Sequence, residues 1–183
     1  MKRFFVFALF VLMFAAHHNP VAAQITMSRP LYEPSTRFVE KDFKWSAKKG
    51  TGVISGLATL RSPGGYIQTA DGEEVTLIAK NAYTDEIVSK TREDGFFDEY
   101  LNVKKNPKYD KYRITQMADK KGGFRFENLP AGKWYIVTRV IWYTRDQTSQ
   151  MHVNGGLLWG EISLSDGQVR DDIKLNSIIH MTK

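Results

Sequence analysis

The feature that most constrains the fold is a series of short, strand-like segments that begins near residue 52. Turn residues interrupt the series roughly every ten residues, a spacing typical of β-sandwiches. The segments expected to form strands are 53–60, 73–79, 86–91, 112–118, 124–127, 134–143, 157–164 and 169–175. The pattern predicts an all-β sandwich domain over residues 50–183.

The segment 134–143 carries apolar side chains on both of its faces. Trp134 and Ile136 share one face, and Tyr135 and Val137 share the other, because successive side chains of a strand point in opposite directions. A strand that is apolar on both faces has to be covered on both. We therefore expect a central strand, with the second sheet on one face and an N-terminal arm or a mid-domain insertion on the other.

Residues 24–49 differ from the rest of the chain and predict an irregular N-terminal arm. Prolines and scattered charges are frequent here, and apolar residues are sparse. Three aromatic residues are exceptions: Phe38, Phe43 and Trp45. We expect their rings to pack back on the sandwich as an edge strand. The alternative is an arm that adds a strand to the sheet of a partner.

Residues 92–111 form a second irregular stretch, which we interpret as an insertion. Apolar side chains lie four residues apart, Phe96 with Tyr100 and Phe97 with Leu101, which suits one or two turns of helix. The lysine-rich residues 104–121 are interrupted by acidic ones. We expect a solvated loop there rather than a surface for nucleic acid, and contact with acidic lipid or polysaccharide stays open.

The N-terminus has the three parts of a secretory signal peptide. Two basic residues precede the apolar run 4–16, and small side chains follow up to Ala23. The run is shorter than the roughly 20 residues that a membrane-spanning helix needs. We expect cleavage between Ala23 and Gln24, which removes residues 1–23 and leaves a periplasmic or secreted bacterial protein with no transmembrane segment.

The chain contains no cysteine. Disulfides, thiolate metal sites, a cysteine nucleophile and a lipid-modified cysteine are therefore excluded. The fold has to be stabilised by its core alone. The formal net charge of the whole chain is +6, a mildly basic balance that would indicate a polyanion only if the charges were gathered on one face.

The segment 119–134 has the most specific pattern in the chain. Eight of its positions should build a strand, a corner and a second strand: Asp119, Gly122, Phe124, Phe126, Leu129, Pro130, Gly132 and Trp134. Asp119 can accept backbone N–H groups in a turn, and Gly122 can adopt the positive φ of a tight hairpin. Phe124 and Phe126 are two residues apart and should fill the core.

These residues resemble the D-x-x-G-x-F-x-F-x-x-L-x-x-G-x-Y pattern of carboxypeptidase regulatory-like domains, with Trp134 in the place of the usual tyrosine. Residues 53–56 and 74–77 are similar to the family's first two strands. The resemblance covers residues 52–175 and is interrupted at 92–111. It implies a prealbumin-like, antiparallel Greek-key sandwich of about seven strands, and it implies a fold without specifying any chemistry.

A search for catalytic residues finds one weak candidate. After removal of the signal peptide only His152 and His180 remain as histidines. His152 lies in the segment 144–154, which we expect to be a polar hairpin loop, and with Asp146 and Glu161 it would make a minimal acid–base set for a weak hydrolase. We favour a solvated loop histidine instead.

Other chemical sites find little support. The sequence has no nucleophile elbow, paired-histidine zinc motif or phosphate-binding loop, so we expect no enzyme and no cofactor. Asp166, Asp171 and Asp172 more readily cap a turn than hold calcium. Lys49 and Asn176 are a remote candidate pair for an isopeptide bond of the kind that related adhesin repeats form.

The favoured functional hypothesis is a non-catalytic binding or scaffold module that contacts an envelope protein. It would act through a sheet edge, the N-terminal arm or the 144–154 loop. The alternative is binding of a carbohydrate or another cell-envelope polymer, since exposed aromatic rings stack on sugars. The candidate rings for such a strip are Trp45, Trp134, Trp142, Trp159, Tyr135 and Tyr143. We expect most of them to be buried by core and sheet packing, with at most one or two exposed.

Overall fold

The computed structural model describes residues 32–94, 104 and 106–176. The predictions for the signal peptide 1–23, for cleavage between Ala23 and Gln24, for helical turns between Phe96 and Leu101 and for His180 fall outside these residues. Within the described ranges, no helix is both long and apolar enough to cross a membrane.

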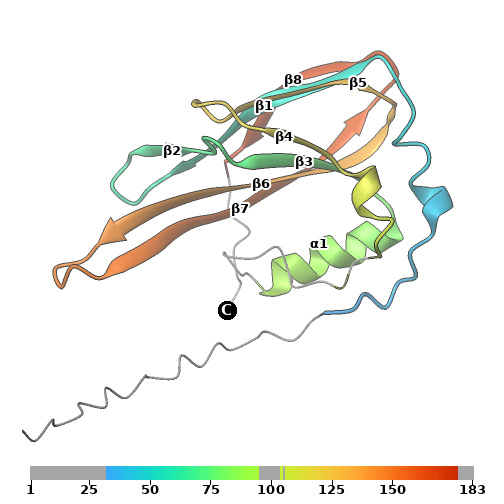
Figure 1. The fold of residues 1–183 in the computed structure, drawn as a ribbon. Helices are drawn as coiled ribbons and strands as arrows, with labels where there is room; N and C mark the ends of the chain where they lie inside the picture. The colour runs from blue at the N-terminus through green and yellow to red at the C-terminus, as the bar shows by residue number, and fades with distance from the viewer. Residues whose placement is uncertain (1–31, 95–103, 105, 177–183) are drawn as a thin grey trace, which may run out of the picture.

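Two four-stranded sheets face each other and form a sandwich (Figure 1). The first sheet has β1 (Gly52–Arg61) at its centre, beside β2 (Ile67–Thr69), β5 (Gly123–Leu129) and β8 (Val169–Leu175). The second sheet has the order β4 (Ile114–Met117), β3 (Glu74–Ala79), β6 (Gly132–Arg145) and β7 (Met151–Leu164). The expected all-β sandwich is confirmed.

The topology differs from the expected antiparallel arrangement of about seven strands. The described residues contain eight strands, because the short β2 pairs with the end of β1. The β8 strand runs parallel to β1, with Val53 beside Val169 and Ala58 beside Leu175. Strand direction was not predictable from side-chain alternation, which is the same in both orientations.

One apolar cluster fills the space between the sheets. Every strand except the short β2 contributes to it, and its larger members are Ile54, Val75, Leu77, Phe124, Phe126, Leu129, Trp134, Ile136, Leu158 and Ile162. Its β6 members are all at even positions. The odd-numbered Tyr135 and Val137 point the other way and belong to a second cluster on the outer face of the second sheet.

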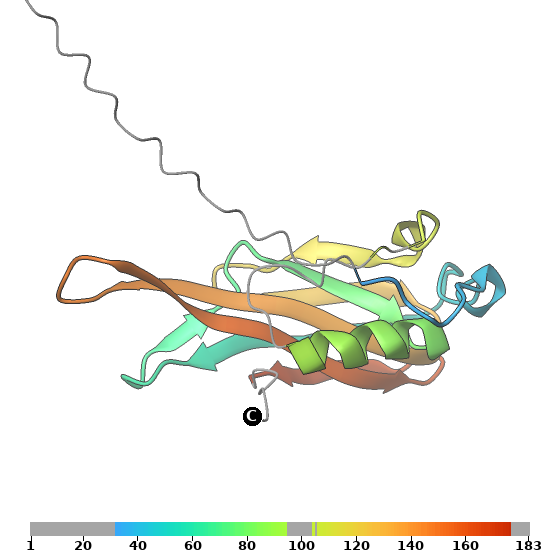
Figure 2. The ribbon, with the colours of Figure 1, turned by 90° about the horizontal axis from the view of Figure 1, so that it is seen from below.

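A third layer covers this outer face, as the two apolar faces of β6 predicted. It contains α1 (Ala82–Asp94), the 3₁₀ helix η1 (Glu40–Asp42) and the 3₁₀ helix η2 (Asp110–Tyr112). Figure 2 shows α1 lying along the second sheet, with the arm passing beside it. The central place of β6, between β3 and β7, is also confirmed.

The helix α1 occupies the segment 86–91, which was predicted to be a strand, so that prediction was wrong. Asn81 begins the helix: its Oδ1 accepts the N–H of Thr84 at 3.1 Å, and the Thr84 hydroxyl accepts the N–H of Asn81 at 2.9 Å. This reciprocal pair satisfies N–H groups that a helix start leaves open. Tyr83 and Ile87, four residues apart, are both buried against the sheet, which is helical spacing.

The described part of the arm, residues 32–49, packs on the sandwich without forming a strand. Phe43 is fully buried, and its ring centroid lies 4.9 Å from that of Phe38 and 5.9 Å from that of Tyr109. Trp45 packs edge-on against Trp134, with centroids 4.9 Å apart. The prediction that these rings return to the sandwich agrees with the structure, whereas the edge strand was wrong because η1 turns the chain there.

Two glutamates tie the third layer together. Glu86 of α1 accepts hydrogen bonds from the backbone N–H of Ser35 (2.7 Å) and of Thr36 (2.6 Å), and from the hydroxyls of Ser35 and Tyr32. Bonds from Thr36, Tyr32 and Ser35 hold the pKa of Glu86 far below its ordinary value. The arm is therefore fixed to α1 by one carboxylate.

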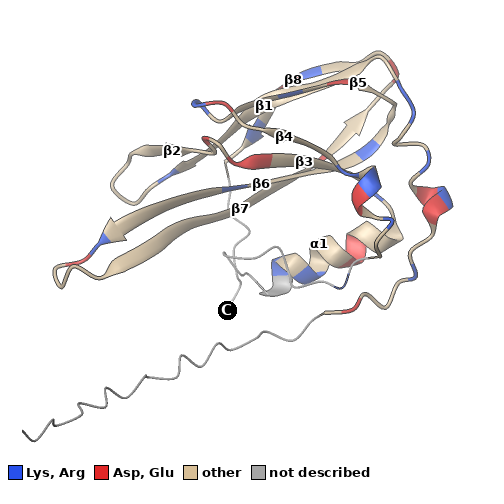
Figure 3. Cartoon of the chain, viewed as in Figure 1, with Lys and Arg blue, Asp and Glu red and all other residues tan. Residues whose placement is uncertain are grey.

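Glu40 of η1 binds residues 108–112 in the same way. It accepts hydrogen bonds from Lys111, from the Tyr112 hydroxyl at 2.9 Å and from Lys108 at 3.2 Å. These bonds lower the pKa of Glu40 to about 2. Figure 3 shows basic and acidic residues together on η1 and η2. The lysine-rich stretch was expected to be a solvated loop, but part of it binds the acidic residues of the arm.

Replacing Phe43 by alanine tests whether the arm belongs to the folded unit. Loss of a fully buried phenylalanine should lower the free energy of unfolding by about 3–5 kcal/mol, measured by urea denaturation. Val39→Ala, at a residue with 42% of its surface exposed, is the control and should change it by no more than about 0.5 kcal/mol. Equal effects of both variants would show that the arm is not integral to the fold.

The glutamate contacts predict a specific loss of stability in acid. The pKa of Glu40 is lowered from 4.5 to about 2, so its contribution is complete above pH 4.5 and is lost as the pH falls toward 2. Glu40→Gln should lower Tm at pH 7, and the difference from wild type should shrink across that interval. Glu33→Gln, which removes only an exposed ion pair with Lys104, should have little effect. A Glu40→Gln difference independent of pH would contradict this account.

Candidate functional site

The motif residues of segment 119–134 build the fold. Asp119 Oδ1 accepts the N–H groups of Lys121 (2.7 Å) and Gly123 (2.8 Å), and these bonds lower the pKa of its carboxyl. Gly122 has φ of 79°, and a Cβ there would lie 2.3 Å from the carbonyl oxygen of Ala58. The motif supplies a turn and its contacts, so the functional site has to be sought elsewhere.

The other motif residues lie in the core or at the corner before β6. The buried ones are Phe124, Phe126, Leu129 and Trp134. Pro130 lies in the corner between β5 and β6, and Gly132 is the first residue of β6. A Cβ on Gly132 would lie 2.1 Å from the Trp45 ring. Glycine is therefore required for the arm to approach the corner.

The most prominent surface feature is a projecting hairpin. Figures 1 and 2 show β6 and β7 continuing together beyond the body of the sandwich. Segment 144–154 was expected to be a loop, but Thr144 pairs with His152 and Arg145 pairs with Met151. Only residues 146–150 form the turn.

A glycine pair explains why the loop prediction was wrong. Gly155 and Gly156 lie between the predicted loop 144–154 and the predicted strand 157–164. Gly155 lies inside β7 with φ of 99°, and a Cβ there would lie 1.9 Å from the carbonyl oxygen of Val140. Glycine marks a close approach of two strands at this position rather than a chain reversal.

The tip of the hairpin is organised by one carboxylate. Asp146 Oδ1 accepts the N–H of Thr148 (2.8 Å), the hydroxyl of Thr148 (2.7 Å) and the N–H of Gln150 (3.0 Å). Its Oδ2 lies 2.8 Å from His152 Nε2. The bonds from His152 and Thr148 lower the pKa of Asp146 to about 2. Asp146 is thus occupied by the turn.

The proposed acid–base set is only partly assembled. Asp146 and His152 meet, but Glu161 lies nine residues farther along β7, roughly 30 Å at strand rise, and forms an ion pair with Lys80 at 3.2 Å. His152 is exposed to solvent. The three residues considered as an acid–base set are therefore not brought together. His152 is solvated, as we favoured, although it lies in β7 and not in a loop.

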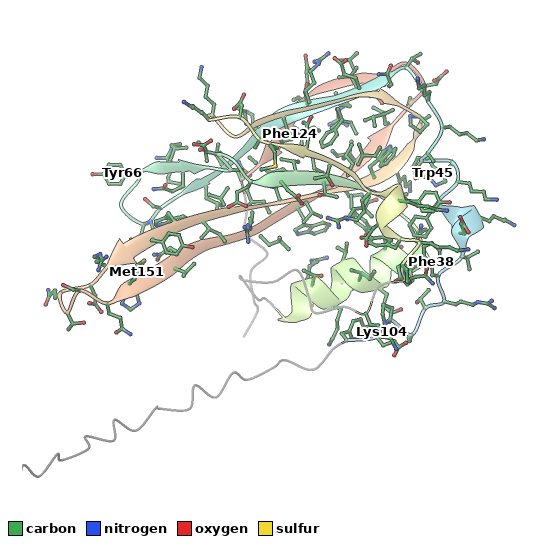
Figure 4. The ribbon with its side chains drawn as sticks, viewed as in Figure 1. Phe38, Trp45, Tyr66, Lys104, Phe124 and Met151 are labelled. Atoms are coloured by element: carbon green, nitrogen blue, oxygen red, sulfur yellow. The ribbon has the colours of Figure 1, made fainter. Side chains whose placement is uncertain are left out.

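The outer face of the projecting hairpin is apolar and exposed. Tyr143 lies directly opposite Val153, and Arg145 opposite Met151. The exposed fractions are 65% for Tyr143, 55% for Met151 and 47% for Val153. Figure 4 shows Met151 near the end of the ribbon, away from the body of the protein. Neighbouring exposed apolar side chains of this kind mark interaction surfaces more often than isolated ones do.

The β7 strand also has an unpaired backbone edge. The N–H of Asp146 donates to the carbonyl oxygen of Gln150 at 3.0 Å, and the β6–β7 register is constant from Arg145–Met151 to Gly132–Leu164. In an antiparallel ladder hydrogen-bonded pairs alternate, so even-numbered residues of β7 bond to β6. The backbone groups of odd-numbered residues 153–163 point away, and no described residue pairs with them.

This free edge is continuous with the apolar face. The side chains of the same odd-numbered residues lie on the outer face of the second sheet, where Val153, Leu157 and Trp159 form a row. The edge spans roughly 33 Å at strand rise. Proteins usually protect such edges with charges, proline or bulges; here Glu161 is the one charged outward side chain between residues 153 and 163.

Charged groups border the end of this row that is nearest the body. The Arg92 guanidinium lies 4.7 Å from the Trp159 ring centroid, in cation–π contact. Lys80 Nζ donates to Asp85 at 3.0 Å and to the Tyr135 hydroxyl, and it pairs with Glu161. Contact with Tyr135, then Asp85 and Glu161, raises the pKa of Lys80. These groups bind one another and hold α1 to β3, β6 and β7.

The six aromatic residues proposed as a sugar-binding strip do not lie on one surface. Trp134 is buried in the core, and Trp45 and Trp142 pack on the same core. Tyr135 and Trp159 face the opposite side, with centroids 6.0 Å apart. Only Tyr143 of this set is mostly exposed. Alternation along β6 separates these rings, so the continuous strip is not formed, and the expectation that most of them pack in the core or on the sheets is confirmed.

The remaining candidate sites are not assembled. The described residues contain no group of histidine, cysteine or acidic side chains able to hold a metal ion; Asp172 pairs with Arg170 at 2.9 Å. Lys49 lies just before β1, which begins at Gly52. Asn176 lies just after Leu175 of β8, which pairs with Ala58 farther along β1. Six strand residues, roughly 20 Å, separate these ends, so an isopeptide bond between them is contradicted.

Comparisons with known proteins show a shared fold. No protein-family model matches the chain, and no curated protein matches it. A solved structure of a proposed carbohydrate-binding protein from Pseudomonas aeruginosa aligns with a TM-score of 0.68 and 22% identity, covering 78% of this chain and 99% of that chain. A 9R-lipoxygenase from Cyanothece aligns with a TM-score of 0.25, 12% identity and 75% of this chain against 19% of its own.

The organisation of the hairpin tip can be tested at Asp146. Replacement by alanine removes the three hydrogen bonds that Oδ1 accepts and the contact of Oδ2 with His152. The amide protons of Thr148 and Gln150 should therefore exchange with deuterium faster at pH 7, while the free energy of unfolding changes little. Thr148→Val removes only the hydroxyl bond and should accelerate exchange less. Unchanged exchange in Asp146→Ala would show that the carboxylate does not order the turn.

Proposed function

We propose that this protein is a non-catalytic binding module that takes up an extended segment of a partner protein by strand addition to β7. The observation that carries the proposal is the unpaired backbone edge formed by the odd-numbered residues 153–163. An added strand would supply the missing hydrogen bonds, and pockets for alternate side chains would supply specificity.

The flanking side chains indicate which segments would fit. A strand added to β7 places every second side chain on the outer face, next to Val153, Leu157 and Trp159. These three residues favour an apolar partner residue at alternate positions. The Arg92 guanidinium, stacked on Trp159, has no carboxylate partner among the described residues and favours an acidic residue in the partner near that ring.

The location and the family belong to the same proposal. Export through the signal peptide expected at residues 1–23 would place the module in the periplasm or outside the cell, where its partner would be an envelope protein. The pattern at 119–134 supports membership of the carboxypeptidase regulatory-like domains. The known members of that group act as accessory domains, which is consistent with binding rather than catalysis.

Carbohydrate binding is the second candidate. A protein of the same fold, at 22% identity, is a proposed carbohydrate binder, and two tyrosine rings in the described part of the chain are exposed and suited to stacking on sugars. Tyr143 lies on the projecting hairpin and Tyr66, 74% exposed, precedes β2.

Double replacement of both tyrosines by alanine should abolish binding to envelope polysaccharide if these rings form the site, and should leave peptide binding at β7 intact.

Proline substitution offers a direct test of strand addition. The N–H of Glu161 points away from β6, so Glu161→Pro keeps the β6–β7 ladder and removes one donor from the free edge. Peptides selected from a random library for binding to the wild-type protein should bind Glu161→Pro at least tenfold more weakly. Glu161→Ala loses the same ion pair with Lys80 but keeps the N–H, and it should bind like wild type.

A second readout identifies the edge itself. In the wild-type complex the outward amide protons of Leu157, Trp159 and Glu161 should exchange with deuterium more slowly than in the free protein. Circular dichroism checks that both variants are folded. Equal binding by the two variants, unchanged exchange at these amides, or failure of the library to yield any binder would each refute strand addition at β7.

A further inference from the structure

A small cavity lies between the arm, α1 and the segment that precedes η2. Its volume is about 300 Å³, and its lining residues are Glu33, Pro34, Thr36, Arg37, Phe38, Tyr83, Lys104, Asn106 and Pro107. Figure 4 labels two of these residues, Phe38 and Lys104, both near α1. The volume is at the lower end of the range for ligand pockets, which favours one ring over a chain of rings.

The walls of the cavity are fixed before any ligand arrives. Glu86 holds the arm through Ser35 and Thr36. On the other side the N–H of Asn106 donates to the Tyr83 hydroxyl at 3.0 Å, and the N–H of Lys104 donates to the carbonyl oxygen of Tyr32 at 2.8 Å. A preformed site avoids the cost of ordering its walls on binding.

One part of the lining is apolar and the other part is polar. Pro34, Phe38 and Pro107 offer apolar surface, and the Phe38 ring is supported by the largely buried Tyr83 at a centroid distance of 5.4 Å. Surfaces of this kind match the C–H face of a sugar ring. A purely apolar ligand would leave the polar part of the lining without partners, which is costly.

The polar part carries both donors and an acceptor. Arg37 is exposed and has no hydrogen-bond or ion-pair partner among the residues that the structure describes, whereas Lys104 pairs with Glu33 at 3.3 Å. Two cations and one carboxylate leave one positive charge, which favours a ligand with one negative charge. Hydroxyl groups can donate to Glu33 and accept from Lys104 and Arg37, which a carboxylate alone cannot do.

We propose that this cavity, formed by the arm, Tyr83, Lys104, Asn106 and Pro107, binds a uronic acid, an acidic monosaccharide unit with its ring on the apolar wall and its carboxylate on Arg37. The site is separate from the β7 edge and does not depend on strand addition. Its ligand is defined by chemistry: one pyranose ring, several hydroxyl groups and one carboxylate.

NMR titration of the ¹⁵N-labelled protein with the sodium salts of D-glucuronate, D-galacturonate and D-mannuronate tests the proposal. At least one uronate should produce saturable shifts at Phe38, Tyr83 and the side-chain amide of Asn106. D-Glucose should bind at least tenfold more weakly, because it lacks the carboxylate. Sodium acetate should produce no saturable shift, since it lacks the ring.

Variants then connect the binding to the cavity. Arg37→Ala should weaken uronate binding at least tenfold, and Lys41→Ala, which removes an exposed cation of the same arm outside the cavity, should leave it unchanged. Glu161→Pro should bind uronate like wild type, which separates this site from the β7 edge.

Three results would overturn the proposal: equal affinity for glucose and the uronates, no shift with any uronate, or no effect of Arg37→Ala. Tighter binding of N-acetylphenylalanine than of every uronate would also overturn it and indicate a site for peptide carboxylates.

Discussion

The whole architecture depends on β6 being apolar on both faces. An ordinary sandwich strand needs cover on one face only, and its other face can be solvated. Because Tyr135 and Val137 are buried opposite Trp134 and Ile136, the second sheet needs a further layer. The arm, α1 and the segment around η2 supply it, so segments that the sandwich pattern treats as additions complete its hydrophobic core.

The sequence allowed much of the sandwich to be predicted but little of the candidate site. Alternation and turn residues located most strands, and the spacing of Phe124 and Phe126 predicted their burial. The segment 86–91 was predicted to be a strand but lies in α1. Its few apolar residues give a weak pattern, and the helix is marked instead by the hydrogen bonds between Asn81 and Thr84 at its start. The extension of β6 and β7 was not predicted, because two consecutive glycines, Gly155 and Gly156, are typical of a turn and not of a strand interior. The free edge of β7 depends on the order of strands in the sheet, which a local pattern does not encode.

Carboxylates organise the periphery in the way that apolar side chains organise the interior. Glu86, Glu40 and Asp146 each accept several hydrogen bonds from a segment outside the two sheets and α1. Each has its pKa lowered by those bonds. The arm and the hairpin tip are thereby held in defined conformations without disulfides. Such preorganisation matters for binding, because flexible segments lose entropy when a ligand orders them.

The ladder between β6 and β7 has consequences for how this protein can vary. Since alternate residues face opposite sides, a single inserted residue within the ribbon would exchange its two faces and carry Tyr143 or Val153 to the wrong side. Inserting one residue in each of the two strands would keep their pairing and the turn. Inserting two residues in each strand would also return every side chain to its original face. Each pair of residues added to a strand lengthens the ribbon by roughly 7 Å. The length by which the β6–β7 hairpin projects from the sandwich can therefore change in steps of two residues per strand, while the core stays the same.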